Sequence, residues 1–196
     1  MLDFKRVQRY TDAVGAVRDA TGMLHSSAAT MMDCMYQENY RHYQPQHFDI
    51  RELVPRREFD ALGDKALILL DARIVWTADA LWEVSQKECF VGAYPLPEKQ
   101  KNRRVWCNTW MFGGQAQYRG YRPHDAAIGA VHSQHRYGRA LDLHFDGIPA
   151  EVMRKWILAN TGHAATRYIS AIEDDVSWLH VDCRNSGNDE IVVFGA

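Results

Sequence analysis

Residues 133–145 read SQHRYGRALDLHF, and this stretch decides the fold. Its last six residues alternate between two faces of an extended chain, with Asp142 and His144 on one face and Leu141 and Leu143 on the other. Side chains of a β-strand point alternately to opposite sides of the sheet. The alternation therefore predicts a half-buried strand with one polar face, on which chemistry can be carried out.

A second segment with the same alternation begins at Trp178. Its sequence, WLHVDC, places His180 and Asp182 together on a polar face. Between the two strands, residues 149–160 predict a helix with Pro149 at the first helical position, where a missing N–H does no harm. The run IVVF near the C-terminus predicts a last short strand.

The first half of the chain has the spacing of helices. Apolar or small residues recur every three or four positions over 7–31, which predicts one long helix with an apolar stripe. Residues 58–87 have helical spacing and no proline, and they predict a second long helix. Ahead of it, HFDIRELVP predicts a short helix with Asp49 as N-cap and Glu52 as the third helical residue.

The order of these elements predicts the fold class and the domains. Helices come first, followed by strands with one crossing helix, which indicates an α+β domain with a small, mostly antiparallel sheet and flanking helices. The aromatic and polar stretch 36–47, which contains Pro45, is interpreted as a linker or an extended arm. We therefore expect an N-terminal helical extension in residues 1–40 and one α+β domain in residues 41–196.

The apolar stripe of the extension must be buried against something. Two partners remain open: its own domain, or another chain in a self-associated form or in a larger assembly.

Composition excludes several classes of function. The net charge of -2 and the pI near 6.5 provide no electrostatic footprint for nucleic acid. The longest apolar run, 66–70, is too short to span a membrane. The N-terminus has no apolar segment of a signal peptide, so we expect synthesis in the cytoplasm. The four cysteines contain no CxxC pair, which argues against a thiolate zinc site.

A hydrolytic zinc site needs three protein ligands and one open position for water. His180 and Asp142 stand on the polar faces of two predicted strands, where their side chains can converge. His135 precedes Asp142 by seven residues, and Gly138 between them allows a tight turn that folds His135 back over the strand. On these residues alone, a metal site and a surface or hydrogen-bonded role for the histidines remain about equally favoured.

The motifs resemble those of the M15 family of zinc peptidases. The pattern SxHxxGxAxD of that family is matched at every fixed position, and WLHVD resembles its W-x-H-x-D motif. The segment GYR at 120–122 resembles the family's SGYR, and HFDIRELV resembles the usual start of the domain. The resemblance covers roughly residues 47–192, in several pieces that occur in the family's order.

The resemblance implies a fold, a cofactor and an activity. The fold is the small α+β zinc domain shared with hedgehog signalling domains, and the Zn²⁺ ligands are His135, Asp142 and His180. Arg122, in GYR, would steady the scissile carbonyl or a substrate carboxylate, since a guanidinium supplies charge next to a developing oxyanion. The family includes D-Ala-D-Ala carboxypeptidases, dipeptidases and phage endolysins.

We therefore expect a zinc metallopeptidase that hydrolyses peptidoglycan stem peptides, as a D,D-carboxypeptidase or an endolysin-type endopeptidase. It would act on the cell wall after release or as part of a phage particle. The scissile bond stays open.

The sequence departs from the family at two positions. Arg119 replaces the serine before GYR, and Ser177 stands where many members have a catalytic carboxylate. The missing carboxylate favours an alternative function, a non-catalytic binding or structural protein on the same fold.

An active enzyme needs another proton acceptor for its nucleophilic water. The carboxylates available near the second strand are Glu173, Asp174, Asp175 and Asp182. We favour Asp182, on the face of His180, or Asp175, which precedes the strand. For Asp182 a role in orienting a histidine is equally consistent with the pattern.

Overall fold

The computed structural model describes residues 43–98, 100–188 and 190–195. The chain divides into two units, Met1–His42 and Tyr43–Ala196, and the following description concerns the second. The helical extension expected in residues 1–40 lies outside the described residues. None of the described helices is long and apolar enough to cross a membrane.

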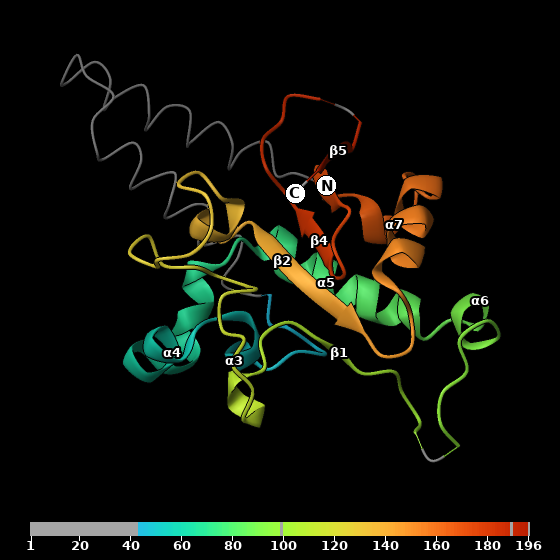
Figure 1. Cartoon of the computed structure of the whole chain (residues 1–196), viewed down its shortest axis with the longest axis horizontal. Coiled ribbons are helices and arrows are strands. Elements are labelled where there is room, and N and C mark those ends of the chain that lie inside the picture. Colours follow the sequence, from blue (N-terminus) through green and yellow to red (C-terminus); the bar gives the residue numbers. More distant parts are fainter. Residues whose placement is uncertain (1–42, 99, 189, 196) are drawn as a thin grey trace, which may run out of the picture. The chain divides into compact units, whose positions relative to one another are not determined.

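The described unit has helices first and most of its strands later, around one sheet (Figure 1). The helices and helical turns are α3 (Ile50–Leu53), α4 (Arg56–Leu62), η1 (Gly63–Leu69), α5 (Ala72–Ser85), α6 (Glu88–Val91), η2 (Trp110–Phe112), η3 (Gln134–Tyr137), α7 (Ala150–Ala159) and η4 (Ala164–Thr166). The strands are β1 (Val105–Trp106), β2 (Ala140–Phe145), β3 (Ala171–Asp174), β4 (Leu179–Asp182) and β5 (Val192–Gly195).

The sheet has the order β1-β2-β4-β3-β5. The pairs β1–β2, β2–β4 and β3–β4 are antiparallel, and only the pair β3–β5 is parallel. An α+β fold with a mostly antiparallel sheet is therefore confirmed. Strand β3 has no counterpart in the sequence prediction, although it lies inside the sheet between β4 and β5.

One face of the sheet forms the hydrophobic core with helices α5 and α7 (Figure 1). The apolar residues of β2 and β4 that alternation assigned to this face are fully buried: Leu141, Leu143, Leu179 and Val181. They share one cluster with Ile74 and Leu81 of α5 and with Met153 and Ile157 of α7. Each such side chain contributes about 2 kcal/mol of hydrophobic stabilisation. The polar face of the same strands is thereby fixed on the opposite side.

The prediction of one helix over residues 58–87 is wrong. Helix α4 ends at Gly63, whose φ of 57 leaves the helical range, and a 3₁₀ segment follows up to Leu70, which is extended. Asp71 then begins α5 as an N-cap, with its side chain accepting a hydrogen bond from the backbone N–H of Arg73. Gly and Asp are both residues that end or restart helices, and here they override the apolar spacing.

Other boundaries differ by one or two residues. Pro149 is the N-cap of α7 and not its first helical residue. The short helix predicted in HFDIRELVP is α3, and its capping box between Asp49 and Glu52 is confirmed.

The chain from Tyr43 to Phe48 has no regular structure, but it is fixed to helix α5. Asp79 of that helix, which is buried, accepts hydrogen bonds from the hydroxyl of Tyr43 and from the backbone N–H groups of Gln46 and His47. The ring of His47 stacks on Trp82 at 3.7 Å between centroids. The described end of the predicted linker is therefore part of the domain surface.

Candidate metal centre

Strands β2 and β4 bring two of the predicted ligands face to face. Asp142 and His180 are direct partners in the antiparallel register of these strands. The alternation of each strand sends both side chains to the polar face, away from α5 and α7. The side chains of directly opposed residues are close enough to interact, so the register alone brings the two groups together.

The third residue, His135, reaches the site from the turn η3. This turn ends at Gly138, which has a left-handed backbone with φ 65. A side chain at position 138 would also collide with the chain, because its Cβ would lie 2.0 Å from the carbonyl oxygen of Leu69. Only glycine fits both conditions. The turn folds His135 over the start of β2, as the sequence predicted.

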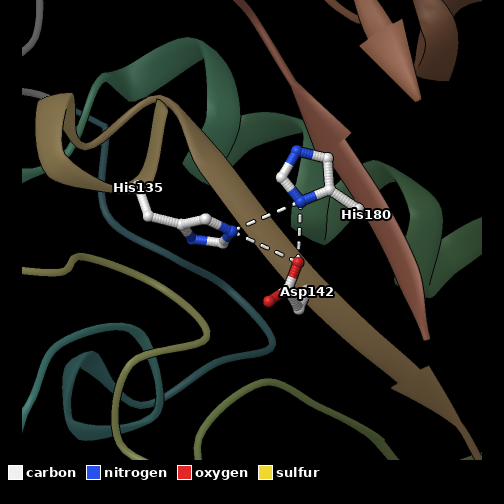
Figure 2. A group of neighbouring side chains, drawn as sticks. All are labelled: His135, Asp142 and His180. Atoms are coloured by element: carbon white, nitrogen blue, oxygen red, sulfur yellow. Dashed lines mark hydrogen bonds and ion pairs between the residues drawn. The ribbon is translucent and has the colours of Figure 1, made fainter. Parts of the chain in front are cut away.

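The three side chains form a compact triad around one carboxylate oxygen (Figure 2). Asp142 Oδ1 lies 2.8 Å from His180 Nδ1 and 3.3 Å from His135 Nε2, and the two nitrogens are 3.3 Å apart. His135, Asp142 and His180 are 3%, 7% and 6% exposed. The triad is thus withdrawn from bulk solvent.

The outer nitrogen of each histidine faces an acceptor. His135 Nδ1 lies 2.8 Å from the carbonyl oxygen of Gly120, which makes it the donor in this hydrogen bond. His180 Nε2 lies 3.5 Å from Asp182 Oδ2. At 2.8 Å from a carboxylate oxygen, the inner nitrogen of His180 donates its proton to Asp142. An acceptor beside the outer nitrogen would let a metal ion replace this inner proton, as in histidines that bind metals.

Charges in the triad are strongly coupled. Burial opposes ionisation of Asp142, but the charge and hydrogen bond of His135, followed by those of His180, hold the pKa of this carboxyl well below its usual range. Burial also opposes protonation of His180, but Asp142 and Asp182 outweigh it and raise the pKa of His180 to about 9. When no cation is bound, the proton on His180 therefore balances negative charge of the neighbouring carboxylates Asp142 and Asp182.

The triad has the dimensions of a metal site. Its three ligand atoms lie within 4.8 Å of one another, and no other group of three or more potential ligands is found among the described residues. Tetrahedral zinc with bonds of about 2.0–2.1 Å separates its ligand atoms by about 3.3 Å. The observed separations of 2.8–3.3 Å match this spacing, so the triad could hold a metal ion.

Arg122 lies in the loop that leads to η3. Its guanidinium donates to the hydroxyl of Ser133 at 3.4 Å and to the carbonyl of Tyr118 at 3.1 Å. Burial lowers the pKa of Arg122, and the charge of Asp142 counteracts this shift. No described carboxylate forms an ion pair with Arg122. Its positive charge, close to the triad, could therefore be neutralised by a negatively charged group of a bound ligand.

The two carboxylates favoured as proton acceptors lie in different surroundings. Asp182 is fully buried and is held by the side chain and backbone N–H of Arg184, while its other contact is the outer nitrogen of His180. Asp175 is exposed in the turn between β3 and β4, with φ 60. Asp182 is placed to orient His180, and Asp175 is not brought to the triad.

Glu173 is the carboxylate that sequence reasoning passed over. It is the register partner of His180 on β3, and its Oε2 lies 3.9 Å from His180 Nδ1. The next strand places Phe194 opposite Glu173, with its ring against His180 at 5.7 Å between centroids. One row therefore crosses four strands in the order Asp142, His180, Glu173 and Phe194. The segment AIED has no alternation of apolar and polar residues, so neither the strand β3 nor its pairing with β4 was predicted.

In comparisons with known proteins, no family model, no curated protein and no solved structure matches this chain.

Proposed function

We propose that this protein is a zinc-dependent peptidase that hydrolyses peptidoglycan stem peptides. The observation that carries the proposal is the spacing of 2.8–3.3 Å between the three buried ligand atoms, combined with an acceptor beside the outer nitrogen of each histidine. Two neutral imidazoles and one carboxylate are a ligand set that suits zinc, and three ligands leave a position for water. The M15-like motifs favour peptide hydrolysis over other hydrolytic reactions.

The surrounding residues supply what the reaction needs beside the metal. Zinc, when bound, lowers the pKa of water and polarises the scissile carbonyl. Glu173 takes the proton from the attacking water, because its carboxylate lies beside the ligand atom of His180 and is partly accessible. Arg122 binds the negative charge of the substrate or of the oxyanion with its planar fork. Asp182 keeps His180 in the tautomer that binds zinc.

The first test concerns the metal. His180→Ala removes one ligand, and we expect the zinc content to fall from one ion per chain to a small fraction. His132→Ala is the matched control, since His132 is exposed and lies only three residues from His135. Elemental analysis after dialysis against zinc gives the result. Unchanged zinc content in His180→Ala would remove the basis of the proposal.

The second test concerns the reaction. Zinc-loaded protein is incubated with purified peptidoglycan, and the products are identified by mass spectrometry. Release of terminal D-Ala indicates a carboxypeptidase, and shortened or separated stem peptides indicate an endopeptidase. A protein that binds zinc but leaves the peptidoglycan intact, in this assay and in zymography on cell walls, supports the alternative of a binding or structural protein.

A further inference from the structure

Arg136 directly follows the ligand His135 but points into the preceding loop. Its guanidinium donates to the carbonyl oxygens of five loop residues: Pro123, His124, Ala126, Ile128 and Ala130. The hydrogen bonds to Pro123, Ala126, Ile128 and Ala130 are 3.0 to 3.2 Å long. A guanidinium has five N–H donors, so the number of acceptors equals the number of donors.

This arginine is buried without a counter-ion. It is 7% exposed, and no described carboxylate forms an ion pair with it. Buried charges are normally paired with an opposite charge, because loss of hydration costs several kcal/mol. Here five carbonyl dipoles replace the hydration shell. A lysine could not do this, since it has three donors on one atom and no fixed fork.

The ends of the loop are tied to the metal ligand itself. The backbone N–H of Arg122 donates to the carbonyl of His135 at 3.0 Å, and the carbonyl of Gly120 accepts from the His135 ring at 2.8 Å. The chain between these points therefore closes on itself, and the side chain of Arg136 fills its interior.

The loop in turn confines Arg122. Gly129 has φ 77, and a Cβ built there would lie 1.9 Å from Arg122 Nη1. The backbone at Gly129 thus lies directly against the guanidinium. If the loop became more mobile, Arg122 would lose its contact with the backbone at Gly129 and its hydrogen bond to Ser133.

We propose that Arg136 is a positioning residue, which organises the loop 123–130 through its carbonyl oxygens and thereby fixes Arg122 beside the metal centre. The part of this inference that concerns turnover rests on the proposed peptidase function. The part that concerns the loop and Arg122 does not, and it has its own measurements.

The structural measurement uses Arg136→Lys with zinc bound. Arg103→Lys is the matched control, because Arg103 is also buried and donates to backbone carbonyls, those of Ser85, Tyr94 and Asp146. Hydrogen exchange of residues 123–131 should accelerate about tenfold in Arg136→Lys and less than about twofold in the control. Labelling of Arg122 by phenylglyoxal, followed by peptide mass spectrometry, should accelerate in parallel. Unchanged exchange in the loop, or unchanged labelling of Arg122, would overturn the proposal.

Gly129→Ala provides a second variant, which carries the test if Arg136→Lys does not fold. It leaves Arg136 in place but introduces a methyl group where Arg122 lies. We expect faster labelling of Arg122 with zinc content unchanged. Labelling at the wild-type rate would show that the loop does not confine Arg122.

The measurement of turnover is a double-mutant cycle of Arg122→Lys and Arg136→Lys on stem peptides. If Arg136 acts through Arg122, Arg136→Lys alone should lower kcat/KM about tenfold, and adding it to Arg122→Lys should change kcat/KM less than about twofold. Additive losses would contradict the positioning role. If the wild-type protein cleaves no stem peptide, the proposed function fails, and exchange and labelling still decide the role of Arg136.

Discussion

At the scale of single residues, the centre is organised by one oxygen atom. Asp142 Oδ1 lies within 3.3 Å of one nitrogen of each histidine, so a single carboxylate oxygen contacts both rings. A proton on His180 stabilises the same carboxylate that a metal ion would bind. Protons and metal therefore compete for one site, and the competition determines how the centre responds to pH.

Zinc affinity should rise with pH between 7 and 9. The pKa of His180 is raised from 6.5 to about 9, so its protonated form stabilises the metal-free protein fully below pH 6.5 and loses this effect as the pH approaches 9. Zinc must displace that proton, and its affinity should increase about tenfold per pH unit in this interval. Competition with a chelator of known affinity at pH 7, 8 and 9 measures the slope. An affinity that stays constant would show that His180 is already neutral at pH 7.

Glu173→Gln should abolish most turnover while zinc remains bound. The amide keeps the shape of the side chain but accepts no proton, and loss of a general base typically lowers kcat by about 10²–10⁴-fold. Asp175→Asn, in the turn of the same hairpin, is the control and should retain nearly wild-type kcat. Both variants are compared on stem peptides after their zinc content has been measured. If Asp175→Asn is the inactive one, the favoured proton acceptor changes.

The positions of the three candidate ligands could be foreseen, because each follows from local patterns. Alternation fixes the faces of Asp142 and His180, and Gly138 fixes the turn of His135. Glu173 could not be identified in the same way. Its proximity to His180 depends on which strand pairs with β4, and the four residues AIED, which do not alternate, encode neither a strand nor its partner.

At the scale of elements, the helices show how local signals outweigh periodicity. The capping box of α3 involves residues three apart, and it forms as predicted. The break between α4 and α5 is also local, since Gly63 and Asp71 were visible as helix breakers. The segment η1, which lies between Gly63 and Asp71, also buries some of its apolar side chains. The apolar spacing therefore continues through it and by itself suggested one helix.

Helix α5 should depend on Asp79 for its contact with the preceding segment. Asp79→Ala removes the acceptor of three hydrogen bonds, from Tyr43, Gln46 and His47, and leaves those donors without a partner. We expect a loss of about 3 kcal/mol in the free energy of unfolding. Glu83→Ala on the same helix is the control, because Glu83 is mostly exposed and its 3.6 Å contact with His47 is weak. Urea denaturation of both variants measures the difference. Equal stabilities would show that the segment contributes nothing.

At the scale of the whole molecule, the described unit contains its own core. Helices α5 and α7 and the sheet share one buried cluster, and all three residues that could hold a metal ion belong to that unit. The segment that begins at Tyr43 is fixed to α5 by the hydrogen bonds to Asp79. All of these contacts join residues of the described unit.

A chain truncated to begin at Tyr43 should therefore remain folded and bind one zinc ion. We expect it to be monomeric in light scattering, with a melting temperature within a few degrees of that of the full chain. If residues 1–42 mediate association, only the full chain should form larger particles. Aggregation of the truncated chain, or a large drop in its melting temperature, would instead show that the N-terminal stripe is buried against this domain.

The register between β2 and β4 also has a consequence for the folding pathway. Asp142 and His180 are 38 residues apart in the chain, and His135 and His180 are 45 apart. Such distant segments meet only after a large loop has closed, and contacts of this kind tend to form late and slowly. Contacts that form after the rate-limiting step of folding slow unfolding and leave the folding rate almost unchanged. An ion bound by this triad would consequently leave the speed of folding nearly unchanged and lengthen the lifetime of the folded protein.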